Sequence, residues 1–180
     1  DVLDSFLNQQ YQQFLLNKAV ALGIKEYLAA EFPNQSVTIK WPNDIYIGDS
    51  KVCGILIQNS LSGRKFDNVI IGIGLNVNQE VFISNAPNPV SMKMLSSINY
   101  NLDLLLDTLL KSIFQYYSLV TRETARLLEQ QYLNSLYRYM QWHQYSVADE
   151  IFTARITGVT TYGRLILESE DSELSDYDIK

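Results

Sequence analysis

The sequence has few of the residues on which common catalytic and metal sites depend. It contains one cysteine, Cys53, and one histidine, His143, among 180 residues. A single cysteine excludes an intramolecular disulfide and a cysteine-based metal site. One histidine gives no convincing Ser-His-Asp arrangement. We interpret Cys53, which lies in an apolar stretch, as an inert core residue, and His143, next to Trp142, as a packed one.

Positive charge and long apolar runs are scarce as well. Lys and Arg number 14 against 20 Asp and Glu, so the formal net charge is -6. Without a basic face for phosphates, the composition argues against nucleic-acid binding. No run is apolar enough to span a membrane, and no signal peptide opens the chain, which with the single cysteine favours a cytoplasmic setting. The chain begins at Asp1 rather than Met, and we expect the natural polypeptide to extend upstream.

Hydrophobic periodicity predicts helices and strands in the first half of the chain. Hydrophobic residues make up 47% of the sequence, which is enough for a core. Residues 4–31 carry a helical period that stops at Pro33, with Lys18 on its wetter side. The pattern then predicts strands at residues 37–40, 45–47, 51–58 and 68–73, and a loop at residues 79–97.

The second half is predicted to contain two helices and a small all-β piece. Asn101 and Thr121 are expected to cap the helices. The apolar faces expected for them are Leu102, Leu105, Leu106, Leu109, Ile113 and Tyr117, and then Leu128, Tyr132, Leu136 and Met140. Strands follow at residues 152–159 and 164–168, around a turn in which Gly163 suits a positive φ. This piece is too small to be stable unless it packs on the rest.

The most informative run is Lys-Trp-Pro-Asn-Asp at residues 40–44. A strand ends there in a rigid corner that presents Asn43 and Asp44 side by side, and the Gly48-Asp49 turn returns Lys51 to the same place. Each residue alone is ordinary turn chemistry. A carboxylate, an amide and an ammonium together suit the handling of a phosphate or another activated oxyanion.

Glycines follow on the next strands. Gly72-x-Gly74-x-Asn76 is not a dinucleotide fingerprint, because the third glycine is missing, and no Walker A sequence occurs. We interpret these glycines, with Gly54, as places where a ligand can approach the backbone closely. Asn76 then offers that ligand a donor and an acceptor.

These runs together resemble the catalytic domain of biotin protein ligases. They read KWPNDI from residue 40, KVCGIL from residue 51 and IGIGLNVN from residue 71. The resemblance implies an α+β fold over residues 1–143, in which a mixed β-sheet packs with helices. Residues 146–180 resemble the small SH3-like β-barrel that follows, with residues 158–165 as its signature hairpin.

The resemblance implies a two-step reaction in the cytoplasm. Biotin and ATP, with Mg²⁺, form biotinyl-5′-AMP and pyrophosphate, and a lysine of a biotin carboxyl carrier protein domain then receives the biotin. By position, Lys51 would be the catalytic residue near the biotin carboxylate and the α-phosphate, and Asp44 would hold Mg²⁺. The remaining binding candidates are Asn43 for the phosphate region, Gly54 for the biotin pocket, Asn76 for the adenine or ribose, and Arg164 for the nucleotide.

The sequence also departs from the family pattern. Family members carry a Gly-Arg-Gly-x-x-Gly loop upstream, which is absent here, so the catalytic domain is expected to be N-terminally incomplete, and its activity alone is left open. No helix-turn-helix domain is present, and a homodimer is left open. Two alternatives remain: a lipoate or octanoate ligase of the same fold, and a non-catalytic module that binds a nucleotide or a carrier protein.

Overall fold

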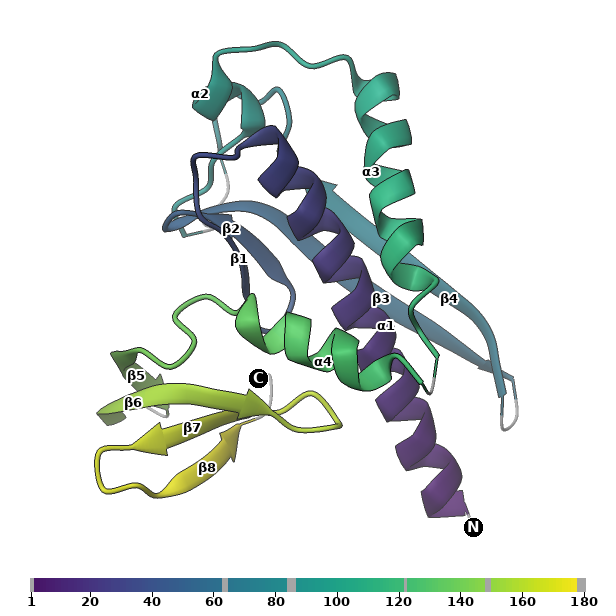
Figure 1. The fold of residues 1–180 in the computed structure, drawn as a ribbon, viewed down its shortest axis with the longest axis vertical. Helices are drawn as coiled ribbons and strands as arrows, with labels where there is room; N and C mark the ends of the chain where they lie inside the picture. Colours follow the sequence, from purple (N-terminus) through teal and green to yellow (C-terminus); the bar gives the residue numbers. More distant parts are fainter. Residues whose placement is uncertain (1, 63–64, 84–86, 122, 148–149, 178–180) are drawn as a thin grey trace.

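The chain folds into two four-stranded antiparallel sheets with helices, an α+β arrangement (Figure 1). The computed structural model describes residues 2–62, 65–83, 87–121, 123–147 and 150–177, without the side chains of residues 2–10, 59–62 and 65–68. In Figure 1, helix α1 (Val2–Glu31) crosses the first sheet, and helix α4 (Ala125–Asn134) lies between that sheet and the second one. Among the described residues, no helix is both long enough and apolar enough to cross a membrane.

The first sheet has the strand order β1-β2-β3-β4. Its strands are β1 (Val37–Lys40), β2 (Asp44–Ile47), β3 (Ser50–Ser62) and β4 (Lys65–Leu75). The prediction of a mixed sheet is wrong here, because all pairings between these strands are antiparallel. The physical reason is that the connections are hairpins, too short for the crossover that parallel neighbours need. Gly48, with φ of 58°, forms the turn between β2 and β3 as expected.

Helix α1 covers one face of this sheet and is confirmed by its buried side chains, Val20, Ile24 and Leu28. Helix α3 (Leu102–Tyr117) packs beside it. The two helices approach closely at Gly23, where a Cβ atom would lie only 2.6 Å from the Cα of Ile113. A side chain at Gly23 would therefore force the helices apart.

Three details of the helices differ from the sequence prediction. Lys18, expected on the wetter side of α1, is buried because α4 packs over it and supplies Glu129 as its ion-pair partner. Thr121 does not cap α4, because the helix begins one turn later; its hydroxyl accepts the N–H of Thr124 instead. Met140 lies beyond the end of α4 and is exposed.

The predicted cap of α3 is confirmed, but its predicted apolar face is only half right. The side chain of Asn101 accepts the N–H groups of Asp103 and Leu104. The buried side chains are Leu105, Leu109 and Ile113, and the exposed ones are Leu102, Leu106 and Tyr117. The helix packs on α1 along one narrow stripe, so the residues that flank this stripe face outward.

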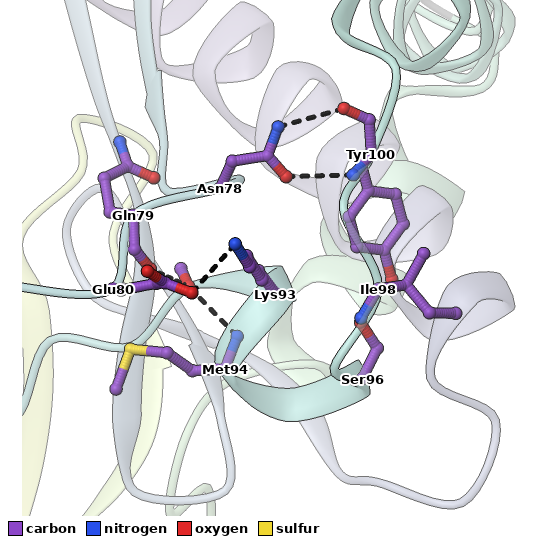
Figure 2. Close-up of polar contacts among 9 residues, drawn as sticks. Asn78, Gln79, Glu80, Lys93, Met94, Ser96, Ile98 and Tyr100 are labelled. Carbon is purple, nitrogen blue, oxygen red and sulfur yellow. Dashed lines mark hydrogen bonds and ion pairs between the residues drawn. The ribbon is translucent and has the colours of Figure 1, made fainter.

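The segment predicted as a loop contains a short helix, α2 (Met92–Ser96). Ser91 caps it by accepting the N–H of Met94, a local signal that the loop prediction overlooked. Figure 2 shows how this region is tied together: Asn78 exchanges two hydrogen bonds with the backbone of Tyr100, and Lys93 pairs with Glu80 at 2.8 Å. Residues 84–86 of the predicted loop lie outside the described residues.

The second sheet has the order β5-β6-β7-β8, all antiparallel. Its strands are β5 (Trp142–Val147), β6 (Glu150–Val159), β7 (Leu165–Ser169) and β8 (Leu174–Tyr177). Gly163, with φ of 92°, lies in the β6–β7 turn as predicted. Because β5 begins at Trp142, residues 142–143 join this sheet rather than the first one. An SH3-like barrel stays a prediction.

Candidate functional site

The structure brings Lys51 and Asp44 together in an ion pair. The Nζ of Lys51 lies 2.6 Å from the Oδ1 of Asp44, and the two side chains are 26% and 23% exposed. Asp44 opens β2 and Lys51 lies near the start of β3, so the turn at Gly48 places them side by side. The predicted convergence of ammonium and carboxylate is therefore seen, and both groups remain accessible from outside.

Gly54 lies directly against this pair. It is the register partner of Asp44 on one side and of Gly74 on the other. A Cβ atom at Gly54 would lie 3.4 Å from the Oδ1 of Asp44 and 3.5 Å from the Nζ of Lys51. A larger side chain there would press on both charged groups, so the glycine keeps the space beside the pair open.

The open face of the first sheet continues from Gly54 as an apolar strip. Leu56 is paired with Gly72, and Ile70 lies two pairs further along on the same face, opposite Gln58; all four residues are exposed. Because side chains alternate across a strand, the opposite face carries the buried Ile55, on the side of the helices. The candidate site thus combines an apolar floor with a charged pair at one end.

Asn43 and Asn76 hold the backbone around the pair. The Asn43 amide donates to the carbonyl of Ile55 at 2.6 Å, and the Ile55 N–H donates back to the Asn43 carbonyl at 2.8 Å. The Asn76 amide donates to the carbonyl of Val90 at 3.1 Å and, at 3.5 Å, to that of Lys51. In this structure both amide groups shape the strands that carry Lys51 and Asp44.

A cavity of about 610 Å³, a volume within the usual range for small-molecule sites, is lined by residues of both sheets, and its lining does not include Lys51 or Asp44. Its lining includes Lys40, Trp41, Tyr46 and Arg138. Lys40 is the register partner of Asp44, and its Nζ donates to the hydroxyl of Tyr46 at 3.2 Å. Sequence reasoning missed Lys40 and Arg138 as lining residues. Lys40 could have been found, since it opens the informative run, but nothing local marks Arg138.

Arg164 lies in the turn before β7, and its ion-pair partner is Asp176 rather than a residue of the first sheet. Its Nη1 is 3.4 Å from the Oδ2 of Asp176, and both side chains are exposed. The residue before it contacts the first sheet, because the indole N–H of Trp41 donates to the carbonyl of Gly163 at 2.8 Å. The structure therefore groups Asp44, Lys51 and Gly54, and leaves Arg164 across this junction.

The single cysteine does not act as a nucleophile in this arrangement. Cys53 is fully buried, and burial raises the pKa of its thiol to about 12. A thiol in that state is inert at neutral pH, which confirms the interpretation from sequence. His143 is half-buried and lines the cavity.

The chemistry of the donors fits a magnesium ion only with help from a substrate. Among the described residues, no group of three or more His, Cys, Asp or Glu side chains could hold a metal ion. Asp44 offers one carboxylate, and one of its oxygens already contacts Lys51. Mg²⁺ is commonly held by one or two carboxylates together with substrate phosphates. Asp44 can therefore take part in such a site when phosphates supply the other ligands.

Residues 3–76 match the model of the Biotin/lipoate A/B protein ligase family. The match covers less than half of the chain. The matched residues include helix α1 and strands β1 to β4, and therefore both Asp44 and Lys51. The resemblance recognised in the sequence is confirmed.

Curated relatives match over short alignments, and the chain spans about a fifth of their length. The chain is 41% identical over 66 residues to Biotin--protein ligase 1, chloroplastic, of Arabidopsis thaliana, and 42% identical over 74 residues to the Bifunctional ligase/repressor BirA of Bacillus subtilis. It is 44% identical over 45 residues to the Biotin--[acetyl-CoA-carboxylase] ligase of Paracoccus denitrificans. These alignments cover 36%, 40% and 25% of this chain, and 18%, 21% and 19% of the relatives.

Solved structures share the fold over most of the chain. The apo biotin protein ligase from Aquifex aeolicus has a TM-score of 0.73 at 19% identity, covering 93% of this chain and 73% of that chain. The same protein in complex with biotin and ATP has a TM-score of 0.71 at 20% identity, covering 91% and 68%. At these identities the likeness shows the fold, which is that of biotin ligase structures.

Proposed function

We propose that this protein is an ATP-dependent biotin–protein ligase. It forms biotinyl-5′-AMP and pyrophosphate from biotin and ATP, and transfers biotin to a lysine of a biotin carboxyl carrier protein. The observation that carries the proposal is the Lys51–Asp44 pair beside Gly54, within the segment that matches the model of the ligase family. A cytoplasmic location is part of the proposal, and a homodimer stays a prediction.

Lys51 has the chemistry that the first step needs. An oxygen of the biotin carboxylate bonds to the α-phosphorus of ATP, the bond to the bridging oxygen breaks, and pyrophosphate leaves. Negative charge concentrates on the phosphoryl oxygens during this attack, and a fixed ammonium stabilises it. Since its side chain is 26% exposed, Lys51 can exchange its contact with Asp44 for one with the substrate.

Asp44 and the apolar strip complete the proposed substrate site. Asp44 would hold Mg²⁺ together with the phosphates, and the ion would offset their negative charge. The exposed Leu56 and Ile70 suit an acyl chain whose carboxylate reaches the charged pair. These features serve biotin and lipoate alike. Biotin is the better candidate because the curated relatives described above are biotin ligases.

Pyrophosphate release from ATP and Mg²⁺ tests the proposal directly. We would compare biotin, lipoate, octanoate and no acid, on this chain and on a version extended upstream, with Lys51→Ala as the inactive control. Biotin-dependent release supports the ligase. Pyrophosphate release that depends on lipoate or octanoate instead of biotin indicates a ligase for that acid. A ligand-induced rise in stability without release from either version indicates a binding module.

A further inference from the structure

A hydrogen bond connects the second sheet to the corner that carries the proposed site. The indole Nε1–H of Trp41 donates to the carbonyl oxygen of Gly163 at 2.8 Å, in a partly buried position. The two residues are 122 positions apart in the sequence, and Gly163 belongs to the β6–β7 turn. Trp41 lies three residues before Asp44. The hydrogen bond therefore reaches the start of the strand that bears the carboxylate.

The β6–β7 turn is held firmly on the helices. A Cβ atom at Gly163 would lie 3.0 Å from the Cδ2 of Phe14, so the backbone of the turn lies against this ring of α1. Phe14 in turn packs edge-on against the buried Tyr132 of α4, with ring centroids 5.9 Å apart. Within the turn, the N–H of Gly163 donates to the carbonyl of Thr160 at 3.0 Å. The carbonyl that receives the indole thus has a fixed place.

Lys51 and Asp44 share the β2–β3 hairpin, and each also has hydrogen-bonded supports of its own. The N–H of Lys51 donates to the carbonyl of Asn88, and its carbonyl accepts the N–H of Val90, both at 2.9 Å. The corner before Asp44 is held at one end by the two hydrogen bonds between Asn43 and Ile55. At the other end it is held by Trp41. Asp44 is also the register partner of Gly54 in the β2–β3 ladder that carries Lys51, so Trp41 is an additional support on the Asp44 side of the pair.

We infer that Trp41 is a positioning residue through which the second sheet sets the place of Asp44 relative to Lys51. The expected effect on activity rests on the function proposed above. The claim that Trp41 sets the position of Asp44 does not depend on that function. On this basis the second sheet is a working part of the site, although its own Arg164 pairs with Asp176 elsewhere.

Trp41→Phe tests the inference, because it removes the indole donor and keeps an aromatic ring. Trp142→Phe is the matched control: Trp142 is the only other tryptophan in the sequence and is 44% exposed on β5. In ¹⁵N–¹H spectra of the whole chain, Trp142→Phe also assigns the two indole signals. Trp41→Phe is expected to shift the backbone amide signals of Asp44 and Gly54, and the control is expected to leave them in place.

Gly163→Ala provides a second, independent variant. Its Cβ would press on Phe14 and displace the turn, so the indole signal of Trp41 should move together with the amide signals of Asp44 and Gly54. The inference is overturned if those two amides keep their positions in both variants.

Kinetics then separate positioning from mere support of the fold. Trp41→Phe is expected to lower kcat for pyrophosphate release about tenfold, with little change in the KM for ATP, because displacement of reacting groups by a fraction of an ångström slows the step itself. An unchanged kcat would overturn the catalytic consequence. If neither this chain nor the version extended upstream releases pyrophosphate, the proposed function fails, and the spectra alone decide the role of Trp41.

Discussion

Two lysine–carboxylate pairs in this protein have the same chemistry and different surroundings. Lys18 lies 3.1 Å from Glu129, with side chains 4% and 30% exposed. Lys51 lies 2.6 Å from Asp44, with side chains 26% and 23% exposed. The first lysine is enclosed between α1 and α4, and the second stands on the open face of the first sheet. Accessibility therefore distinguishes a pair that serves the fold from one that can meet a ligand.

The surroundings of Lys18 explain its enclosure. Its Nζ lies 4.6 Å from the centroid of the Phe14 ring and 6.0 Å from that of Tyr132, so aromatic faces replace much of its hydration. Burial lowers the pKa of Lys18, and Glu129 offsets this only in part. The ammonium of Lys18 is thus enclosed by packed helices. The ammonium of Lys51 lies beside Gly54 and is partly exposed to solvent.

The largest expected difference comes from Lys51→Met. Removal of the ammonium should lower the rate of adenylate formation by about 100-fold or more, as for the loss of one preorganised charge in a site. Stability should change by less than about 1 kcal/mol, because the pair is partly exposed. Pyrophosphate release and urea unfolding measure the two effects. An equal loss of ATP binding and of rate would contradict a transition-state role for Lys51.

Asp44→Asn should have the next largest effect, and it addresses the other half of the open pair. We expect the Mg²⁺ requirement to rise by about tenfold or more, since even the loss of groups that only support metal ligands has effects of that size. The measurement is the rate of pyrophosphate release against Mg²⁺ concentration. An unchanged magnesium titration would count against the metal role.

Lys18→Met should leave kcat unchanged and lower the free energy of unfolding by about 3 kcal/mol, because removing one partner of a buried ion pair leaves the charge of Glu129 without compensation. Urea unfolding and pyrophosphate release test this. A large loss of activity without a loss of stability would show that Lys18, like Lys51, serves the reaction.

The same variant has a pH signature. Since the pKa of Lys18 is lowered from 10.5 in the folded state, the unfolded chain binds more protons between that lowered value and 10.5. Stability should therefore rise with pH across this window, and Lys18→Met should remove the rise. Tyrosine residues ionise in the same pH range in the unsubstituted protein and in Lys18→Met. The difference between their free energies of unfolding, measured against pH, therefore reports Lys18 alone. Parallel curves would show that Lys18 titrates normally.

Arg164→Ala should have the smallest effect, below about threefold in the KM for ATP, because its exposed pair with Asp176 is of the weak surface kind. The KM for ATP, measured by steady-state kinetics of pyrophosphate release, tests this expectation. A loss as large as that of Lys51→Met would place Arg164 in the site.

Local sequence signals predicted the elements near the site well. The apolar period of α1, the Gly48 turn and the cap at Asn101 depend on residues only a few positions apart, and the structure confirms all three. The meeting of Asp44 with Lys51 was predictable for the same reason, because one tight hairpin joins them. The overlooked helix α2 also had a local signal, its Ser91 cap.

The sequence by itself therefore determined the hairpin, its charged pair and the family resemblance, which residues 3–76 carry. Only the tertiary structure decided that Lys18 is enclosed and that Trp41 reaches Gly163. Both depend on contacts between segments more than a hundred residues apart. Such contacts follow from how helices and sheets pack, which periodicity and turn residues do not specify.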